Sequence, residues 1–189
     1  MFQKTIVAAT LMAASLMLSA SASAQVYAGA SVGEAKWNAD CAGTVSCTNN
    51  DTAYKIFGGY SFGPRWDAEV SYFSVGTAKA SFSGVSVDMK GTGFDIAAVY
   101  KVPLSKDWTV FGRMGVAEVK GQADAAMGAF SGSVTTNSAQ PVVGFGVIYN
   151  VTQNFDIRAD IDSRKVKVVS GSGGSGNVTN FTIGGQVSF

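Results

Sequence analysis

The stretch FDIRADID, residues 155–162, decides the fold, because its apolar and charged residues alternate strictly. One parity carries Phe155, Ile157, Ala159 and Ile161, and the other carries Asp156, Arg158, Asp160 and Asp162. Successive side chains of a β-strand point to opposite faces, so a period of two predicts a strand with one apolar and one charged face.

The same period recurs along most of the chain. It predicts strands near residues 26–34, 53–63, 66–76, 92–102, 108–119, 141–150, 155–164 and 178–189. The segments between them alternate between short turns (63–65, 104–107 and 151–154) and long loops (35–52, 77–91, 120–140 and 165–177). Short turns on one side and long loops on the other are typical of membrane barrels. We therefore expect an all-β, eight-stranded, antiparallel, up-and-down transmembrane β-barrel.

Charged residues keep to one parity of these strands. Outside residues 155–162, that parity holds Lys55, Asp67, Glu69, Asp95, Lys101 and Arg113. The exceptions, Glu34 and Glu118, lie at the loop ends of their strands, where a membrane would end. A soluble antiparallel sheet also alternates, with its apolar face inward. The positions of the aromatic residues favour a membrane barrel over a soluble sheet, because many of them lie near the short turns, as in an interfacial belt. These residues are Tyr60, Phe62, Trp66, Trp108, Tyr149, Phe155 and Phe189.

The N-terminus has the layout of a secretory signal. Lys4 precedes an apolar run over 6–18, and Ala22-Ser23-Ala24 resembles a cleavage site. We expect residues 1–24 to be a signal peptide and 25–189 to form the barrel domain. Removing Lys4 leaves acidic and basic residues in equal number, which does not favour nucleic acid as a partner.

Cys41 and Cys47 lie close together in a polar stretch. Export to an oxidising compartment favours a local disulfide between them. A metal site is the alternative, but two thiols in a chain without histidine make a poor ligand set. The lack of histidine also excludes Ser-His and His-carboxylate catalytic arrangements, so we expect no enzymatic activity, cofactor or metal.

Several short motifs, in order, resemble one known family. They are VYAGASVG at 26–33, FGGY at 57–60, FGRMG at 111–115 and PVVGFGV at 141–147. Together they resemble the OmpA-type transmembrane domain and related small outer-membrane β-barrels. The resemblance implies that Glu69 and Arg158 form an interior ion pair. It also implies that the terminal Phe189 is a signal read by the outer-membrane insertion machinery.

Asp95, Arg113, Asp156 and Asp160 are further expected lumen charges. The alternating residues Asp156, Arg158, Asp160 and Asp162 have two interpretations. They form a cation or proton path, or they pair with Glu69, Arg113 and one another to fill the interior, which suits an eight-stranded barrel. Likewise, the Glu69–Arg158 pair stabilises the barrel or acts as a gate.

The predicted function is a structural or surface-interaction (adhesion-like) role in the bacterial outer membrane, through four extracellular loops. Its predicted partners are outer-membrane lipid and lipopolysaccharide, the insertion machinery, and a host or surface ligand. The alternative is a narrow, ion-conducting, porin-like channel. A soluble periplasmic barrel that binds an apolar ligand is a third interpretation.

Overall fold

The computed structural model describes residues 26–38, 46–82, 85–127, 130–167 and 175–189, which form nine strands. These are β1 (Val26–Asn38), β2 (Ser46–Thr48), β3 (Asn50–Ser61), β4 (Trp66–Phe82), β5 (Val85–Pro103), β6 (Trp108–Met127), β7 (Phe130–Asn150), β8 (Phe155–Lys167) and β9 (Ser175–Ser188). The expected signal peptide lies outside the described residues. Within them, no helix is long and apolar enough to cross a membrane.

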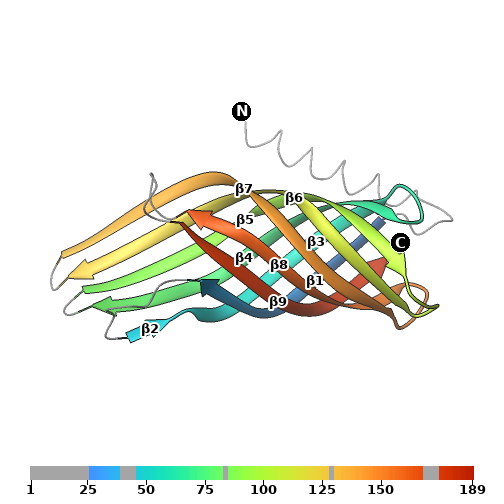
Figure 1. Ribbon diagram of the computed structural model, residues 1–189, viewed down its shortest axis with the longest axis horizontal. Coiled ribbons are helices and arrows are strands. Elements are labelled where there is room, and N and C mark those ends of the chain that lie inside the picture. Colours follow the sequence, from blue (N-terminus) through green and yellow to red (C-terminus); the bar gives the residue numbers. More distant parts are fainter. Residues whose placement is uncertain (1–25, 39–45, 83–84, 128–129, 168–174) are drawn as a thin grey trace, which may run out of the picture.

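Eight of the strands close into an antiparallel barrel (Figure 1). β1 pairs with β3 on one side and with β9 on the other, and each later strand pairs with the next along the chain. The β4–β5 pairing closes the ring. The short β2 lies outside the ring, on the edge of β4, where Cys47 pairs with Ala80. The predicted all-β, eight-stranded, up-and-down barrel is confirmed.

The prediction of long loops at 77–91 and 120–140 was wrong, because most of these residues form strands. Residues 77–91 and 120–140 contain antiparallel ladders, which run from Thr77↔Lys90 to Phe82↔Val85 and from Lys120↔Asn137 to Met127↔Phe130. Their small and polar residues on both faces hide the period of two, whereas the backbone still pairs fully as a hairpin. β4 to β7 therefore extend well beyond the ends of β8, β9 and β1 (Figure 1). We call these extensions, together with β2, the protruding sheet. They are the part of β4 after Gly76, the part of β5 before Thr92, the part of β6 after Lys120 and the part of β7 before Gln140.

A bulge at Gly76 joins the barrel to the protruding sheet. The β4–β5 register shifts between Ser74 and Thr77, and Gly76 has φ of 65°. The Asp51 carboxylate on β3 accepts a 2.6 Å hydrogen bond from the Thr77 backbone N–H. The extra residue reverses the parity of β4, so that both Phe73 and Ala78 are buried inside.

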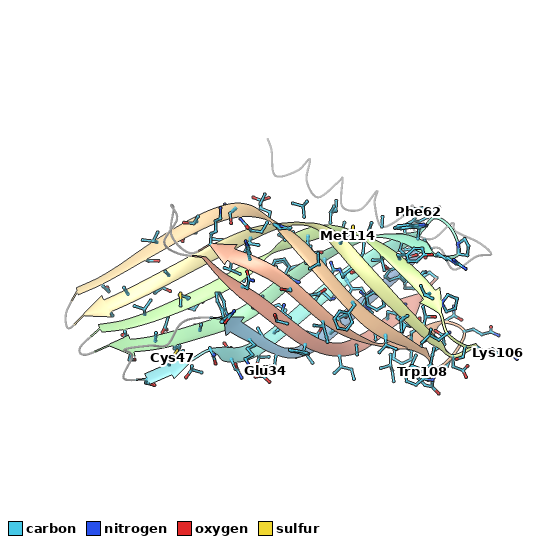
Figure 2. All side chains as sticks on the ribbon, in the orientation of Figure 1. Glu34, Cys47, Phe62, Lys106, Trp108 and Met114 are labelled. Carbon is cyan, nitrogen blue, oxygen red and sulfur yellow. The ribbon has the colours of Figure 1, made fainter. Side chains whose placement is uncertain are left out.

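The two faces of the barrel wall differ as the alternation predicts. On β5, Ala97 and Val99 are buried in the lumen, whereas Phe94 and Ile96 are about two-thirds exposed on the outside. Aromatic rings border this outer surface at the end with the short turns, where Phe62 and Trp108 lie (Figure 2). Trp66 and Tyr100 pack at 4.8 Å between ring centroids, as do Trp108 and Tyr149. The apolar face therefore points away from the barrel axis, which is the arrangement of a membrane barrel.

Candidate functional site

The lumen next to the short turns holds separate, partly solvated pairs. Lys101 forms a 2.8 Å ion pair with Asp67, and the Gln186 amide donates a 2.9 Å hydrogen bond to Asp156. A cavity of about 210 Å³ opens at this level. Asp156 is thus a lumen residue, but it lies at the mouth of the barrel.

Glu69 and Arg158 meet deeper in the lumen, from β4 and β8. Arg158 donates through Nη1 at 2.6 Å and through Nη2 at 3.3 Å, one bond to each Glu69 oxygen. Tyr27 donates to the same carboxylate at 3.0 Å. Phe57 and Phe111 flank the guanidinium, with their ring centroids at 4.5 and 4.3 Å. This bidentate, ring-enclosed geometry holds the pair in one arrangement.

A second set of charges surrounds Arg113. Its guanidinium bonds to Asp162 at 3.1 Å, contacts Asp95, and lies 3.6 Å from Glu69. Lys55 bridges Asp160 at 3.2 Å and Asp162 at 3.1 Å. These contacts join the expected lumen charges Asp95, Arg113 and Asp160 to the Glu69–Arg158 pair in one buried network.

Arg164 completes this network, and sequence reasoning missed its role. It lies 3.4 Å from Asp162 and 3.8 Å from Asp95, and its guanidinium packs over Phe73 at 3.7 Å. The network then contains four carboxylates (Glu69, Asp95, Asp160 and Asp162) and four cations (Lys55, Arg113, Arg158 and Arg164). Equal numbers of opposite charges allow it to be buried without an unpaired net charge.

An apolar layer fills the lumen beyond Arg164, toward the protruding sheet. Its buried members are Ala35, Trp37, Ala53, Phe73, Val75, Ala78, Ala117, Val119, Val142, Val166 and Val178. Trp37, Val75 and Val166, from three different strands, all approach the position of Gly91 on a fourth. The Trp37 indole N–H bonds to the Val75 carbonyl at 3.0 Å. The polar part of the lumen therefore ends at a layer of packed aliphatic and aromatic side chains.

The sequence contained a signal for this layer. Arg164 and Val166 continue the inward parity of residues 158–162, and Ala35 and Trp37 continue that of Ser31 on β1. The predicted strand 155–164 includes Arg164 but stops before Val166, and the predicted strand 26–34 stops before Ala35 and Trp37. Beyond these ends, charged Lys36, Lys165 and Lys167 alternate with the inward residues on the outer face.

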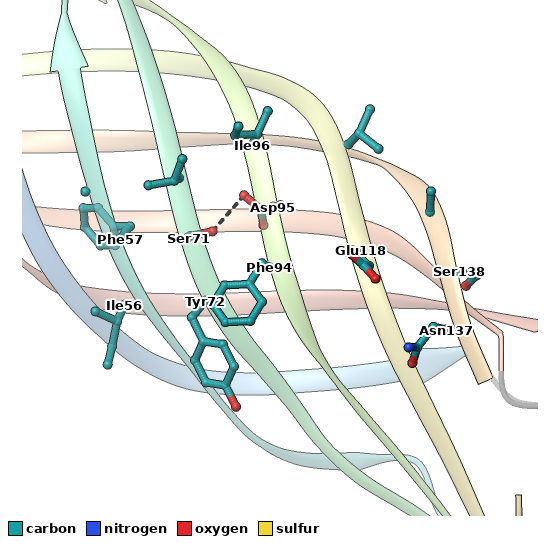
Figure 3. A pocket seen from close by; sticks show the side chains of 14 residues that line it. Ile56, Phe57, Ser71, Tyr72, Phe94, Asp95, Ile96, Glu118, Asn137 and Ser138 are labelled. Carbon is teal, nitrogen blue, oxygen red and sulfur yellow. Dashed lines mark hydrogen bonds between the residues drawn. The ribbon is translucent and has the colours of Figure 1, made fainter. Parts of the chain in front are cut away.

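The outer surface is apolar and grooved. A groove of about 830 Å³ runs across β3 to β7, and Figure 3 shows Ile56, Tyr72, Phe94 and Ile96 along it. Glu118 and Asn137 border the same groove (Figure 3). Glu118 is exposed on the outer face, as its parity predicts.

The two remaining predicted features lie at opposite ends. Cys47 lies on β2 near the far end from the short turns (Figure 2), and Cys41 lies outside the described residues, so their disulfide stays a prediction. Phe189 is exposed, and its backbone N–H bonds to the Val26 carbonyl at 2.9 Å. Among the described residues, no group of His, Cys, Asp and Glu side chains has the arrangement of a metal site.

A closed barrel with a charged, filled lumen and an apolar, aromatic-bordered exterior defines the class of outer-membrane β-barrels. The profile of the OmpA-like transmembrane domain matches residues 21–163, which is more than half of the chain, and the protein belongs to this family. No curated protein sequence matches the chain.

Solved structures show the same fold at low sequence identity. The crystal structure of Neisserial surface protein A (NspA) aligns with a TM-score of 0.63 at 19% identity, over 88% of this chain and 98% of that chain. The attachment invasion locus protein Ail of Yersinia pestis aligns at 0.58 and 18%, over 87% and 99%. OprG of Pseudomonas aeruginosa aligns at 0.53 and 15%, over 87% and 94%. The chain is thus a transmembrane barrel of the bacterial outer membrane.

Proposed function

We propose that this protein is a surface-interaction protein whose protruding sheet is its contact surface. The C-terminus lies on the same side of the barrel as the short turns (Figure 1). In outer-membrane barrels the short turns face the periplasm. The protruding sheet then extends into the medium. It takes the place of two of the four expected loops, 77–91 and 120–140.

The observation that carries the proposal is the free edge of β7. β7 pairs with β8 only from Val142 onward, so residues 131–140 pair with β6 and with no other described strand. This edge, SGSVTTNSAQ, contains no charge and no proline. Proteins usually protect exposed edges with charges, prolines or bulges. On the opposite side of the sheet, β2 covers part of the β4 edge.

An open, uncharged edge suits strand addition. An extended peptide of a partner protein can pair with the backbone N–H and C=O groups of β7, while alternate side chains contact the sheet. The similarity to Ail, whose name is attachment invasion locus protein, is in line with an adhesive role. The ligand class we propose is therefore an extended segment of a host or surface protein.

The test adds charge to the edge. Bacteria that produce the protein should bind cultured epithelial cells or immobilised matrix proteins better than bacteria without it. Thr135→Lys with Asn137→Lys should abolish the difference, because lysines on an edge disfavour pairing. The matched control, Ser86→Lys with Thr92→Lys, adds the same charge to β5, which has a neighbour on each side. No adhesion by the unmodified protein, or equal loss in both variants, contradicts the proposal.

The apolar layer argues against the alternative of an ion channel. Conduction needs a continuous wet path, and the layer around Trp37, Val75 and Val166 interrupts the polar lumen. We expect purified protein in planar bilayers to show no stepwise conductance, and Glu69→Gln to leave this unchanged. Regular conductance steps from the unmodified protein would support the channel.

Export and insertion are proposed from the two chain ends. We infer cleavage after Ala24, so that N-terminal sequencing of the membrane-extracted protein should begin at Gln25. We also propose that Phe189 is the insertion signal. Deleting Phe189 should lower the inserted fraction in cells, whereas refolding into detergent should change little.

A further inference from the structure

Six outward-facing lysines lie just beyond the apolar band of the barrel, at the base of the protruding sheet or level with that base. They are Lys36 on β1, Lys79 on β4, Lys90 on β5, Lys120 on β6, and Lys165 and Lys167 on β8, and all are exposed. This level of the barrel corresponds to the headgroup region of the outer leaflet. The lysines fall into two groups of three with different surroundings.

The group on β4, β5 and β6 lies among carboxylates. Lys79 pairs in register with Asp88, and Lys90 lies 4.0 Å from Asp124. Glu118 precedes Lys120 on the same outward face. Positive charge on this side is therefore partly neutralised by the protein itself.

Among the described residues, the group Lys36, Lys165 and Lys167 has fewer carboxylate neighbours. The described outward residues around it on β1, β9 and β8 are Asn38, Asn177, Thr179 and Ser163. One described outward carboxylate, Glu34, lies two residues before Lys36, whereas three lie beside the first group. None of the three lysines forms an ion pair with a described residue. β1 and β8 flank β9, and Lys165 lies two residues further along than Lys36, so the two lie about 12 Å apart, from the strand spacing and the rise per residue.

An apolar groove lies below this second group, on the side of the short turns. Its volume is about 530 Å³, and its wall includes Val32, Ile161, Phe181 and Ile183. These residues come from β1, β8 and β9, and the rest of the wall comes from β6 and β7. They lie nearer to the short turns than the lysines do, with one outward position in between, which is that of Glu34 on β1 and of Ser163 on β8. This arrangement is complementary to a lipid, because the lysines can bind an anionic headgroup while the apolar groove holds an acyl chain.

We propose that Lys36, Lys165 and Lys167 bind the phosphates of an outer-leaflet lipid whose acyl chain lies in the groove below. The spacing across β9 fits a headgroup with two phosphates better than one with a single phosphate. The site uses the wall of the barrel and not the β7 edge, so it stands or falls separately from the adhesive surface.

The probe is diphosphoryl lipid A, titrated into the detergent-solubilised protein and followed by native mass spectrometry. Lys36→Gln with Lys165→Gln and Lys167→Gln should weaken retention by on the order of 100-fold, from about fivefold for each lysine near an anionic surface. The matched control, Lys79→Gln with Lys90→Gln and Lys120→Gln, removes the same charge and should weaken it by about threefold or less, because nearby carboxylates already offset that group. Both variants should keep the unmodified protein's heat-modifiable mobility, since all six side chains are exposed.

Two further probes separate the sources of binding. Lipid A without phosphates should bind the unmodified protein as weakly as diphosphoryl lipid A binds the Lys36/Lys165/Lys167 variant. Inorganic phosphate at millimolar concentration should not displace the lipid, because the groove also contributes. Equal weakening in both triple variants, full binding of the dephosphorylated lipid, or displacement by free phosphate would each overturn the proposal.

Discussion

At the scale of single residues, the lumen network shows how charges are buried in a membrane protein. Arg158 bonds to Glu69 and Asp160 and lies between the rings of Phe57 and Phe111. Each guanidinium nitrogen of Arg158 thus has a carboxylate partner, and the flat faces of the guanidinium pack on aromatic rings. Removing one partner leaves the other charge buried, which is far less favourable than removing both.

A double-mutant cycle on Glu69 and Arg158 tests this view. Glu69→Gln and Arg158→Met should each lower the free energy of unfolding by about 3–5 kcal/mol. The double variant should lose clearly less than the sum, because it leaves neither charge unpaired and Met still fills the space between the rings. Urea unfolding in lipid vesicles, followed by tryptophan fluorescence, measures all four proteins. Additive losses would show that the two residues stabilise the barrel independently.

A substitution at Ala98 tests whether the outer face of the barrel contacts lipid. Ala98 is exposed on the outer face of β5, in the apolar band between Ile96 and Tyr100. Ala98→Arg should lower the free energy of unfolding in a bilayer by about 2–4 kcal/mol, and Ala98→Leu should be close to neutral. The same vesicle assay applies. A tolerated arginine would mean that this face does not contact acyl chains.

At the scale of elements, the bulge in β4 controls how the protruding sheet leaves the barrel. A Cβ atom at Gly76 would lie 2.6 Å from the Asp51 Cβ, and its positive φ is unfavourable for other residues. Gly76→Ala should therefore loosen the β4–β5 hairpin and increase its cleavage by added protease, while the barrel remains closed. Gly132→Ala is the control, because its Cβ would meet open space. Equal protease resistance in both variants would contradict this role.

The predicted Cys41–Cys47 disulfide acts on the same scale. Cys47 lies on β2, which pairs with β4 at Ala80, so a disulfide there would tie the 41–47 segment to the protruding sheet. Cys41→Ser with Cys47→Ser should remove about 2 kcal/mol of loop constraint and increase proteolysis near residues 37–50 without affecting barrel assembly. Free thiols in mass spectrometry of the unmodified protein, or failure of the variant to assemble, would refute the assignment.

At the scale of the whole molecule, closure leaves the membrane part without a free strand edge. Unfolding has to break the ring as a unit, because each barrel strand is hydrogen-bonded on both sides. The unheated protein should therefore migrate as a compact band in detergent electrophoresis and shift on boiling. Gly132→Ala serves as a folded control with a change far from the ring. Identical mobility before and after boiling would count against a closed barrel.

The eight barrel strands, their order and their two faces follow from the sequence by itself. A membrane requires every backbone group to pair, and a lipid-facing wall requires an uncharged parity, so local alternation and turn length were sufficient. Residues 155–162 already contain both constraints. The positions of Glu69 and Arg158 on the inner face followed from the same parity.

Only the tertiary structure decided which inward residues meet and where the barrel ends. Arg164, Trp37 and Val75 are far apart in sequence, and ring closure brings them together into the charge network and the apolar layer. The Gly76 bulge changes parity within a strand, which no fixed period can anticipate. The protruding sheet became visible only from the pairing of β4, β5, β6 and β7. Its strands have small and polar residues on both faces, so none of them shows an alternating pattern in the sequence.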